Sequence, residues 1–161
     1  MKSFQDLFQE MKCNQIHYNG MLVERSFSFV KHGKFKFRFK FIQTNSTFTQ
    51  AIDVYFIDFR GNIKINGKSI RLSKGNYPHV VFFENSSPKE IELDLQIQQG
   101  WISICNASDP IGTNQFAYSM IFGCAMIKQE LSKNSYRFFC NDHEIDDDFD
   151  DLIFELEIIT D

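Results

Sequence analysis

The chain of 161 residues lacks the features that mark several classes of protein. It has no apolar leader near its start, and no run of the roughly 20 apolar residues that a membrane-spanning helix needs. Its four cysteines form no C-x-x-C pair, and no histidine lies at zinc-finger spacing from them. We therefore expect a reduced, cytoplasmic protein without a membrane span, with release by a non-classical route as the alternative.

Motifs of catalysis are missing as well. The chain contains no G-x-S-x-G, no glycine-rich phosphate loop and no H-E-x-x-H. A pair of carboxylates acting as glycosidase acid and base is one possible exception. However, the acidic residues crowd into one loop, which suits a metal better than two groups that face each other across a cleft. We expect a protein that is not an enzyme.

Phenylalanine is abundant, with 19 residues against 5 Tyr and 1 Trp, and aromatic side chains favour strands. Residues 34–42 indicate a half-buried strand, because cations and phenylalanines alternate strictly over residues 34–41 (KFKFRFKF). We expect turns at Arg60–Asn62, Asn66-Gly67 and Gln99-Gly100, and a loop at Asn106–Asn114. The remaining apolar or alternating segments predict strands at 21–30, 51–59, 62–66, 69–72, 80–83, 90–97, 101–105, 116–127, 136–140 and 152–159.

One helix is predicted, at residues 3–12 within an N-terminal segment 1–13. Its apolar residues recur at helical spacing, and Ser3 followed by Asp6 resembles a capping box. No repeat, linker or low-complexity segment divides the chain. The closely spaced strands therefore predict a single all-β domain over residues 1–161, an antiparallel β-sandwich of the jelly-roll or galactose-binding-like type.

The cationic side of residues 34–41 has two interpretations. A basic stripe beside aromatic residues can bind nucleic acid. The favoured interpretation is a solvated outer face that protects a sheet edge, with the phenylalanines in the core. We therefore expect no nucleic-acid partner, although an acidic partner, including the acidic loop of a second copy, stays open.

Residues 141–151 form a loop of unusual charge just before the last predicted strand. Seven acids and no Lys or Arg lie between positions 142 and 151, and removing them from the 21 acidic residues leaves 14, against 17 Lys and Arg. Like charges packed this densely repel one another unless a cation neutralises them. Calcium suits this task because it binds 6–8 oxygens from carboxylates, amides and backbone carbonyls. The alternative is a solvated acidic run.

An EF-hand explains the same acids less well. Asp146, Asp148, Asp150 and Glu157 match loop positions 1, 3, 5 and 12, but position 6 is Asp151 where the loop needs glycine. The sequence also predicts strands beside the loop, whereas an EF-hand has helices. We reject the EF-hand and keep the metal.

The run from Asp146 to Leu156 (DDDFDDLIFEL) resembles the D-x-D-[FY]-N-D-[LV]-[VI]-[FV] ending of a family of bacterial β-domains that often occur in cell-surface proteins. The chain from Gly123 is also similar to the C-terminal part of the calcium-dependent galactose-binding lectins of the PA-IL type. That resemblance places the lectins' calcium-ligating Asp on Asp142, their Thr on Asp146 and their two Asn on Asp150 and Asp151, with a one-residue shift. It covers about 40 residues, and Asp replaces both Asn.

The resemblance implies a calcium-binding, lectin-like module in which the ion contacts sugar hydroxyls. The alternative is a protein-interaction or structural domain with a closed metal site or a partner-facing patch; homo-oligomers are compatible with either. The predicted metal ligands are Asp142, Asp146, Asp148, Asp150 and Asp151. The predicted ligand-contacting residues are Asn141, His143, Trp101 and Tyr118.

Overall fold

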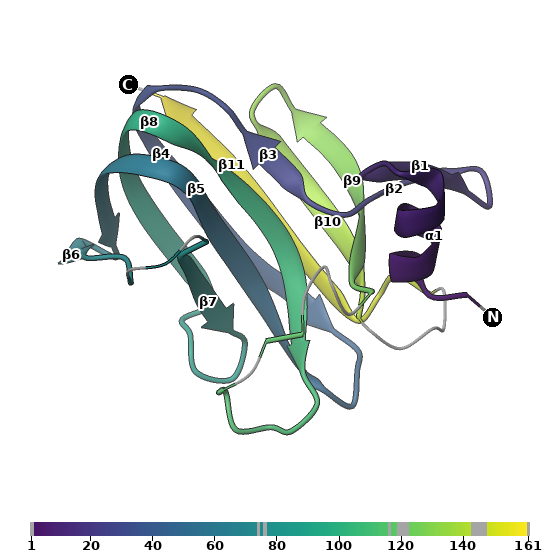
Figure 1. The fold of residues 1–161 in the computed structure, drawn as a ribbon. Helices are drawn as coiled ribbons and strands as arrows, with labels where there is room; N and C mark the ends of the chain where they lie inside the picture. The colour runs from purple at the N-terminus through teal and green to yellow at the C-terminus, as the bar shows by residue number, and fades with distance from the viewer. Residues whose placement is uncertain are drawn as a thin grey trace.

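The computed structural model of the chain shows one strongly curved antiparallel sheet of 11 strands, preceded by a short helix (Figure 1). The structure describes residues 2–73, 75, 77–115, 117–118, 123–142 and 148–160. The elements are α1 (Phe4–Met11), β1 (Gln15–Tyr18), β2 (Met21–Glu24), β3 (Phe27–Phe29), β4 (Gly33–Thr44), β5 (Thr49–Ile65), β6 (Lys68–Ile70), β7 (His79–Phe83), β8 (Glu90–Asp109), β9 (Ala125–Ser132), β10 (Ser135–Asn141) and β11 (Leu152–Thr160). The predicted class, an antiparallel all-β sandwich with a short N-terminal helix, is confirmed.

Two long strands, β5 and β8, belong to both layers of the sandwich. The first half of β8 lies between β4 and the second half of β5, in a layer ordered β1-β2-β9-β10-β11-β4-β8-β5-β6. The second half of β8 pairs with β3 and with the first half of β5, which also pairs with β7. The register of β5 against β8 shifts between Ile57 and Gly61, and bulges of this kind increase the local bend of a strand.

The core lies between these two layers and is rich in phenylalanine. Phe37 and Phe39 of β4 are fully buried, as are Val54 of β5 and Ile104 of β8. The phenylalanines of β4 thus face inward as predicted, because side chains alternate between the two faces of a strand. The opposite face carries Lys36, Arg38 and Lys40, and the acidic residues of neighbouring strands pair with these cations: Glu90, Glu92, Asp94 and Glu157.

Helix α1 is capped as predicted. The Ser3 side chain accepts a hydrogen bond from the Asp6 backbone, and the Asp6 carboxylate accepts one from the Ser3 backbone. The helix buries Phe4 and Phe8 in a second apolar cluster, against β1, β2 and Phe149. No helix in the described part of the chain is both long enough and apolar enough to cross a bilayer.

Several predicted boundaries are wrong. Arg60–Asn62 and Gln99-Gly100 are bulges inside the continuous strands β5 and β8, not turns. Residues 21–30 form two strands, β2 and β3, that pair with different partners, and β1 was not predicted. Asn106–Asp109 belongs to β8, so the predicted loop begins later. The hairpin turn at Asn66-Gly67 is confirmed, with φ values of 47° and 84°.

Candidate functional site

The acidic loop connects β10 to β11 at the end of the sandwich where β4 finishes. Leu152, the first residue of β11, pairs with Thr44 near the end of β4. Within the loop Phe149 is buried at 4% exposure and packs on Phe4, with ring centroids 5.3 Å apart. This anchor holds the acids on either side of Phe149 in defined positions.

Asp142, directly after β10, is buried inside a polar network. Its Oδ2 accepts hydrogen bonds from Ser46 Oγ at 2.7 Å and from Gln50 Nε2 at 3.2 Å. Its backbone N–H donates to Asp151 Oδ2 at 2.8 Å. Asp142 and Asp151 are each 2% exposed. The network therefore ties both ends of the acidic loop to the segment between β4 and β5.

Asp148, Asp150 and Asp151 form a compact carboxylate cluster. Each contributes an oxygen, and these oxygens lie within 4.8 Å of one another. The three side chains run from exposed (Asp148) through partly buried (Asp150) to buried (Asp151). Asn45 Nδ2 donates to Asp150 Oδ2 at 2.8 Å, whereas Asp150 Oδ1 is buried without a hydrogen-bond partner among the described residues.

This cluster could hold a metal ion. Burying a carboxylate oxygen without a partner is costly, and a cation would relieve that cost at Asp150 Oδ1 while reducing the repulsion among the three acids. Carboxylate oxygens are hard donors that suit calcium or magnesium rather than softer metals. Strands flank the loop on both sides, which agrees with the rejection of an EF-hand.

The other predicted site residues fall in three places. Asp142 joins Asp151 through the hydrogen bond described above, and His143 and Asp146 lie outside the described residues. The backbone carbonyl of Asn141 accepts from Asn106 Nδ2 at 2.9 Å, and the backbone of Tyr118 pairs with Ser108. Asn141 and Tyr118 thus lie at the same end of the sandwich as the acidic loop.

Trp101 does not join this end. It is five residues before Asn106 on β8, about 16 Å along the strand, and its side chain points to the opposite face. Any contact of Trp101 with a ligand therefore belongs to a surface separate from the acidic cluster.

Three residues of the site were not predicted: Asn45, Ser46 and Gln50. Asn45 and Ser46 lie in the connection between β4 and β5 and Gln50 lies at the start of β5, about 90–105 positions from their partners in the chain. No prediction from the sequence covered residues 43–50, and only the pairing of β4 with β11 brings this segment beside the acids.

A second polar pair, also not predicted, joins the neighbouring strands β5 and β7 and consists of a buried acid and a partly exposed histidine. His79 Nδ1 is 2.8 Å from Oδ1 of Asp53, and the imidazole stacks on Tyr55 with ring centroids 4.9 Å apart. Burial raises the pKa of Asp53, and the hydrogen bond to Asp53 raises the pKa of His79. A lone acid in the apolar run AIDVYF (51–56) was the only signal for this pair in the sequence.

The cysteines near the acidic end are buried thiols. Burial and the nearby Asp142 carboxylate raise the pKa of Cys124 well above its ordinary value, and burial does the same to Cys140. Cys105 is also buried, and only Cys13 is exposed. A protonated, buried thiol is a poor nucleophile and a poor metal ligand, so these residues serve packing.

No protein-family model matches this chain, and no curated protein matches it.

Proposed function

We propose that the chain is a calcium-binding, non-catalytic β-sandwich module whose ion site is formed by Asp148, Asp150 and Asp151. The observation that carries this proposal is the buried, unpartnered Asp150 Oδ1 within a cluster of three carboxylates. Because a hydrogen bond from Asn45 holds Asp150 and Phe149 is anchored on Phe4, the cluster needs little rearrangement to accept an ion.

Calcium fits this donor set better than magnesium. Three carboxylates offer up to six oxygens from adjacent positions of one loop, which gives an irregular arrangement. Calcium tolerates irregular shells of 6–8 oxygens, whereas magnesium demands near-octahedral geometry and keeps several waters. We expect calcium to bind at least about tenfold more tightly than magnesium.

We propose further that the ion recognises carbohydrate through its solvent side. Asp148 is exposed, so the cluster opens outward and leaves room for sugar hydroxyls to enter the coordination shell. The opposing feature is the buried network of Asp142 and Asp151, which favours the alternative, an ion that only stabilises the loop or forms part of a protein-binding surface. The two roles differ in whether a coordination position stays open.

Ion binding is tested by calorimetric titration with calcium and magnesium, together with thermal unfolding in calcium or EDTA. Calcium at 100–1,000 times its Kd should stabilise the fold by about 3–4 kcal/mol. Asp150→Asn should abolish both signals, because it removes the charge and keeps the size of the side chain. Asp58→Asn is the matched control: it is an exposed acid with a φ of 48°, which asparagine accepts, and it should behave like the parent chain.

Sugar binding is tested separately, with a glycan array probed in calcium and in EDTA. Signal that requires calcium and is lost in Asp150→Asn supports the lectin-like role. Calcium binding without calcium-dependent glycan signal overturns the carbohydrate proposal and leaves the stabilising role. No calcium binding at all overturns both.

A further inference from the structure

Strand β7 lies at an open edge of the sandwich. Among the described strands it pairs with β5 alone, so one side of its backbone has no neighbouring strand (Figure 1). The other edge strands of the described chain, β1, β3 and β6, have three or four residues, whereas β7 has five. Shortness is one of the usual protections of an edge strand against pairing with a further chain. By this measure β7 is the least protected edge.

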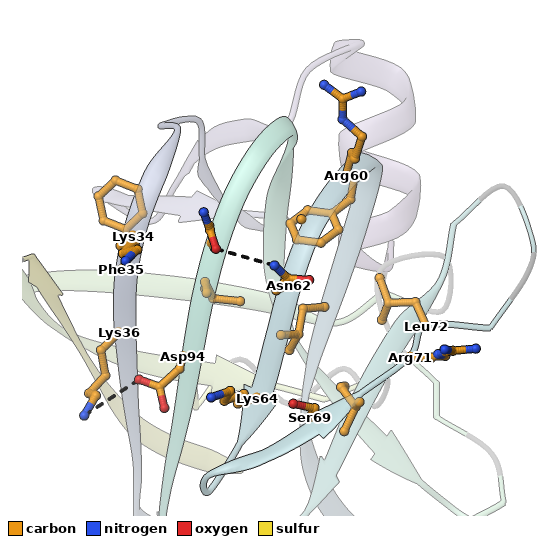
Figure 2. Close-up of a pocket in the computed structure, with 16 residues that line it drawn as sticks. Lys34, Phe35, Lys36, Arg60, Asn62, Lys64, Ser69, Arg71, Leu72 and Asp94 are labelled. Atoms are coloured by element: carbon orange, nitrogen blue, oxygen red, sulfur yellow. Dashed lines mark hydrogen bonds and ion pairs between the residues drawn. The ribbon is translucent and has the colours of Figure 1, made fainter.

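Charged side chains protect β6 but not β7. Lys68 begins β6 and Arg71 directly follows it, and Figure 2 shows Arg71 at the end of this strand. Cations at an edge oppose the approach of another strand, because pairing would crowd or bury their charge. Residues 79–83 (HVVFF) contain no Lys, Arg, Asp, Glu or Pro. The edge of β7 is therefore apolar apart from the titratable side chain of His79.

The hydrogen bonds to β5 define which backbone groups of β7 face the open side. The Phe56 N–H donates to the Pro78 carbonyl at 2.9 Å. Bonds to one neighbour recur at every second residue of an antiparallel ladder, so the even-numbered residues of β7 bond to β5. The N–H and C=O groups of His79 and Val81, and the N–H of Phe83, therefore face the open side. The Phe83 carbonyl already accepts hydrogen bonds from the turn that follows β7.

We infer that a second copy of this chain pairs with β7, antiparallel, about a two-fold axis at Val81. This axis brings all five residues of β7 into the pairing. Each Val81 N–H would donate to the partner's Val81 carbonyl, and each Phe83 N–H to the partner's His79 carbonyl. Val80 would lie opposite the partner's Phe82, and pairs of aromatic and β-branched side chains stabilise neighbouring strands. The edge thus complements itself, as the patch of a two-fold dimer must.

This pairing would place the two acidic loops at opposite ends of the dimer. The Glu84 N–H, just after β7, donates to the Gln50 carbonyl, and Gln50 Nε2 donates to Asp142 beside the acidic loop. The end of β7 is thus near the acidic network, and an antiparallel partner has its own network beyond the start of β7. One pair of short strands forms a small interface, which is typical of weak association. We therefore expect a Kd of about 10–100 μM.

Sedimentation velocity of the folded chain, from about 1 μM to about 1 mM, tests this pairing across the expected Kd. We expect dimers at the higher concentrations, equally in calcium and in EDTA, because the acidic cluster lies outside the interface. Val81→Lys should weaken the association at least about tenfold, since it places like charges opposite each other at the axis. Val30→Lys is the matched control, the same change at a valine that is 69% exposed and outside the strands, and it should dimerise like the parent chain.

A second variant and amide hydrogen exchange make the result specific to β7. Val81→Pro should abolish the dimer and leave the chain folded, because proline is tolerated on an edge strand where the N–H faces outward. The Val81 amide should gain protection only at dimer-forming concentrations, whereas the Val80 amide is protected at all concentrations.

Three results would overturn the inference. A chain that stays monomeric throughout has no such pairing. Dimers that form equally well with Val81→Lys use another surface. Protection of the Val81 amide at every concentration would show that the edge of β7 is already covered within one copy of the chain.

Discussion

The pairing of Asp53 with His79 makes the stability of the fold depend on pH. The hydrogen bond raises the pKa of His79 above its ordinary value of 6.5, so the folded chain holds this proton more tightly than the unfolded chain. The resulting stability is complete below about pH 6.5 and is lost as the pH rises through the folded pKa. The raised pKa of Asp53 acts in the same direction at lower pH, because the buried carboxyl resists ionisation.

We expect the free energy of unfolding to fall by no more than about 1 kcal/mol above pH 6.5, since the His79 side chain is 41% exposed and solvent weakens pairs of this kind. Urea-unfolding curves between about pH 5.5 and 8.5 measure the effect. His79→Gln is the reference variant, because it removes the titrating imidazole and leaves every other group of the chain in place. If the free energy of unfolding falls as steeply with pH in His79→Gln as in the parent chain, the pH dependence belongs to other groups.

Thiol chemistry gives a second prediction at the residue scale. Only Cys13 is exposed, and burial raises the pKa of the Cys124 and Cys140 thiols. With Ellman's reagent the folded chain should release one equivalent rapidly and the other three at least about a hundredfold more slowly, through local or global opening. Cys13→Ser should remove the rapid phase, and in urea all remaining thiols should react. Two or more rapid thiols in the folded parent would contradict the burial of this cluster.

At the scale of elements, the bend of β5 and β8 depends on Gly100. Its φ is 83°, and a Cβ at this position would lie 2.3 Å from the Ile57 carbonyl oxygen and 2.5 Å from that of Asp58. Gly67, in the hairpin between β5 and β6, has nearly the same φ of 84° but open space around it. Substitutions at the two glycines therefore separate two costs. Both include the cost of a left-handed backbone for a residue with a Cβ, and only the one at Gly100 adds the cost of a clash with neighbouring backbone atoms.

Gly67→Ala should cost about 1–2 kcal/mol, the usual penalty of a left-handed conformation for a residue with a Cβ. Gly100→Ala should cost roughly 1–3 kcal/mol more, because the neighbouring backbone must also move. Chemical denaturation of both variants measures the difference. Equal losses would mean that the bend at the bulge tolerates displacement.

The sequence predicted these elements unevenly, and glycine turns show why. Asn66-Gly67 was correctly predicted as a hairpin, and the same dipeptide at Asn19-Gly20, with φ values of 49° and 77°, connects β1 to β2 but was overlooked. Gly61 and Gly100 were predicted as turns because glycine marks turns and bulges alike. Local sequence does not distinguish a turn from a bulge. The difference depends on whether the partner strand continues past the glycine, which is a property of the tertiary structure.

The candidate site was predictable to the same limited extent. Asp150 and Asp151 stand out by their local charge density, which any reader of the sequence can count. Asn45 reaches Asp150, and Ser46 reaches Asp142, only because β11 pairs with β4, more than 100 residues earlier in the chain.

At the scale of the whole molecule, the acidic cluster lies at one end of the sandwich. Thr44 pairs beside the acidic loop and Gly33 begins the same strand, so the far end of β4 is about 35 Å away. The Debye length is about 8 Å at physiological salt, so the charge of a bound ion is largely screened over this distance. The strands that connect the ends are continuous and share one packed core, which offers no second arrangement for an ion to select.

We therefore expect calcium to act only at its own end of the sandwich. On calcium titration, amide NMR shifts should concentrate in residues beside the acidic cluster, such as Asn45 and Asp150, and should be negligible at Gly33 and Lys34. Asp150→Asn should remove the shifts. Shifts that reach Lys34 in the parent chain would show that β4 and β11 transmit a change in the acidic loop along the full length of the sandwich.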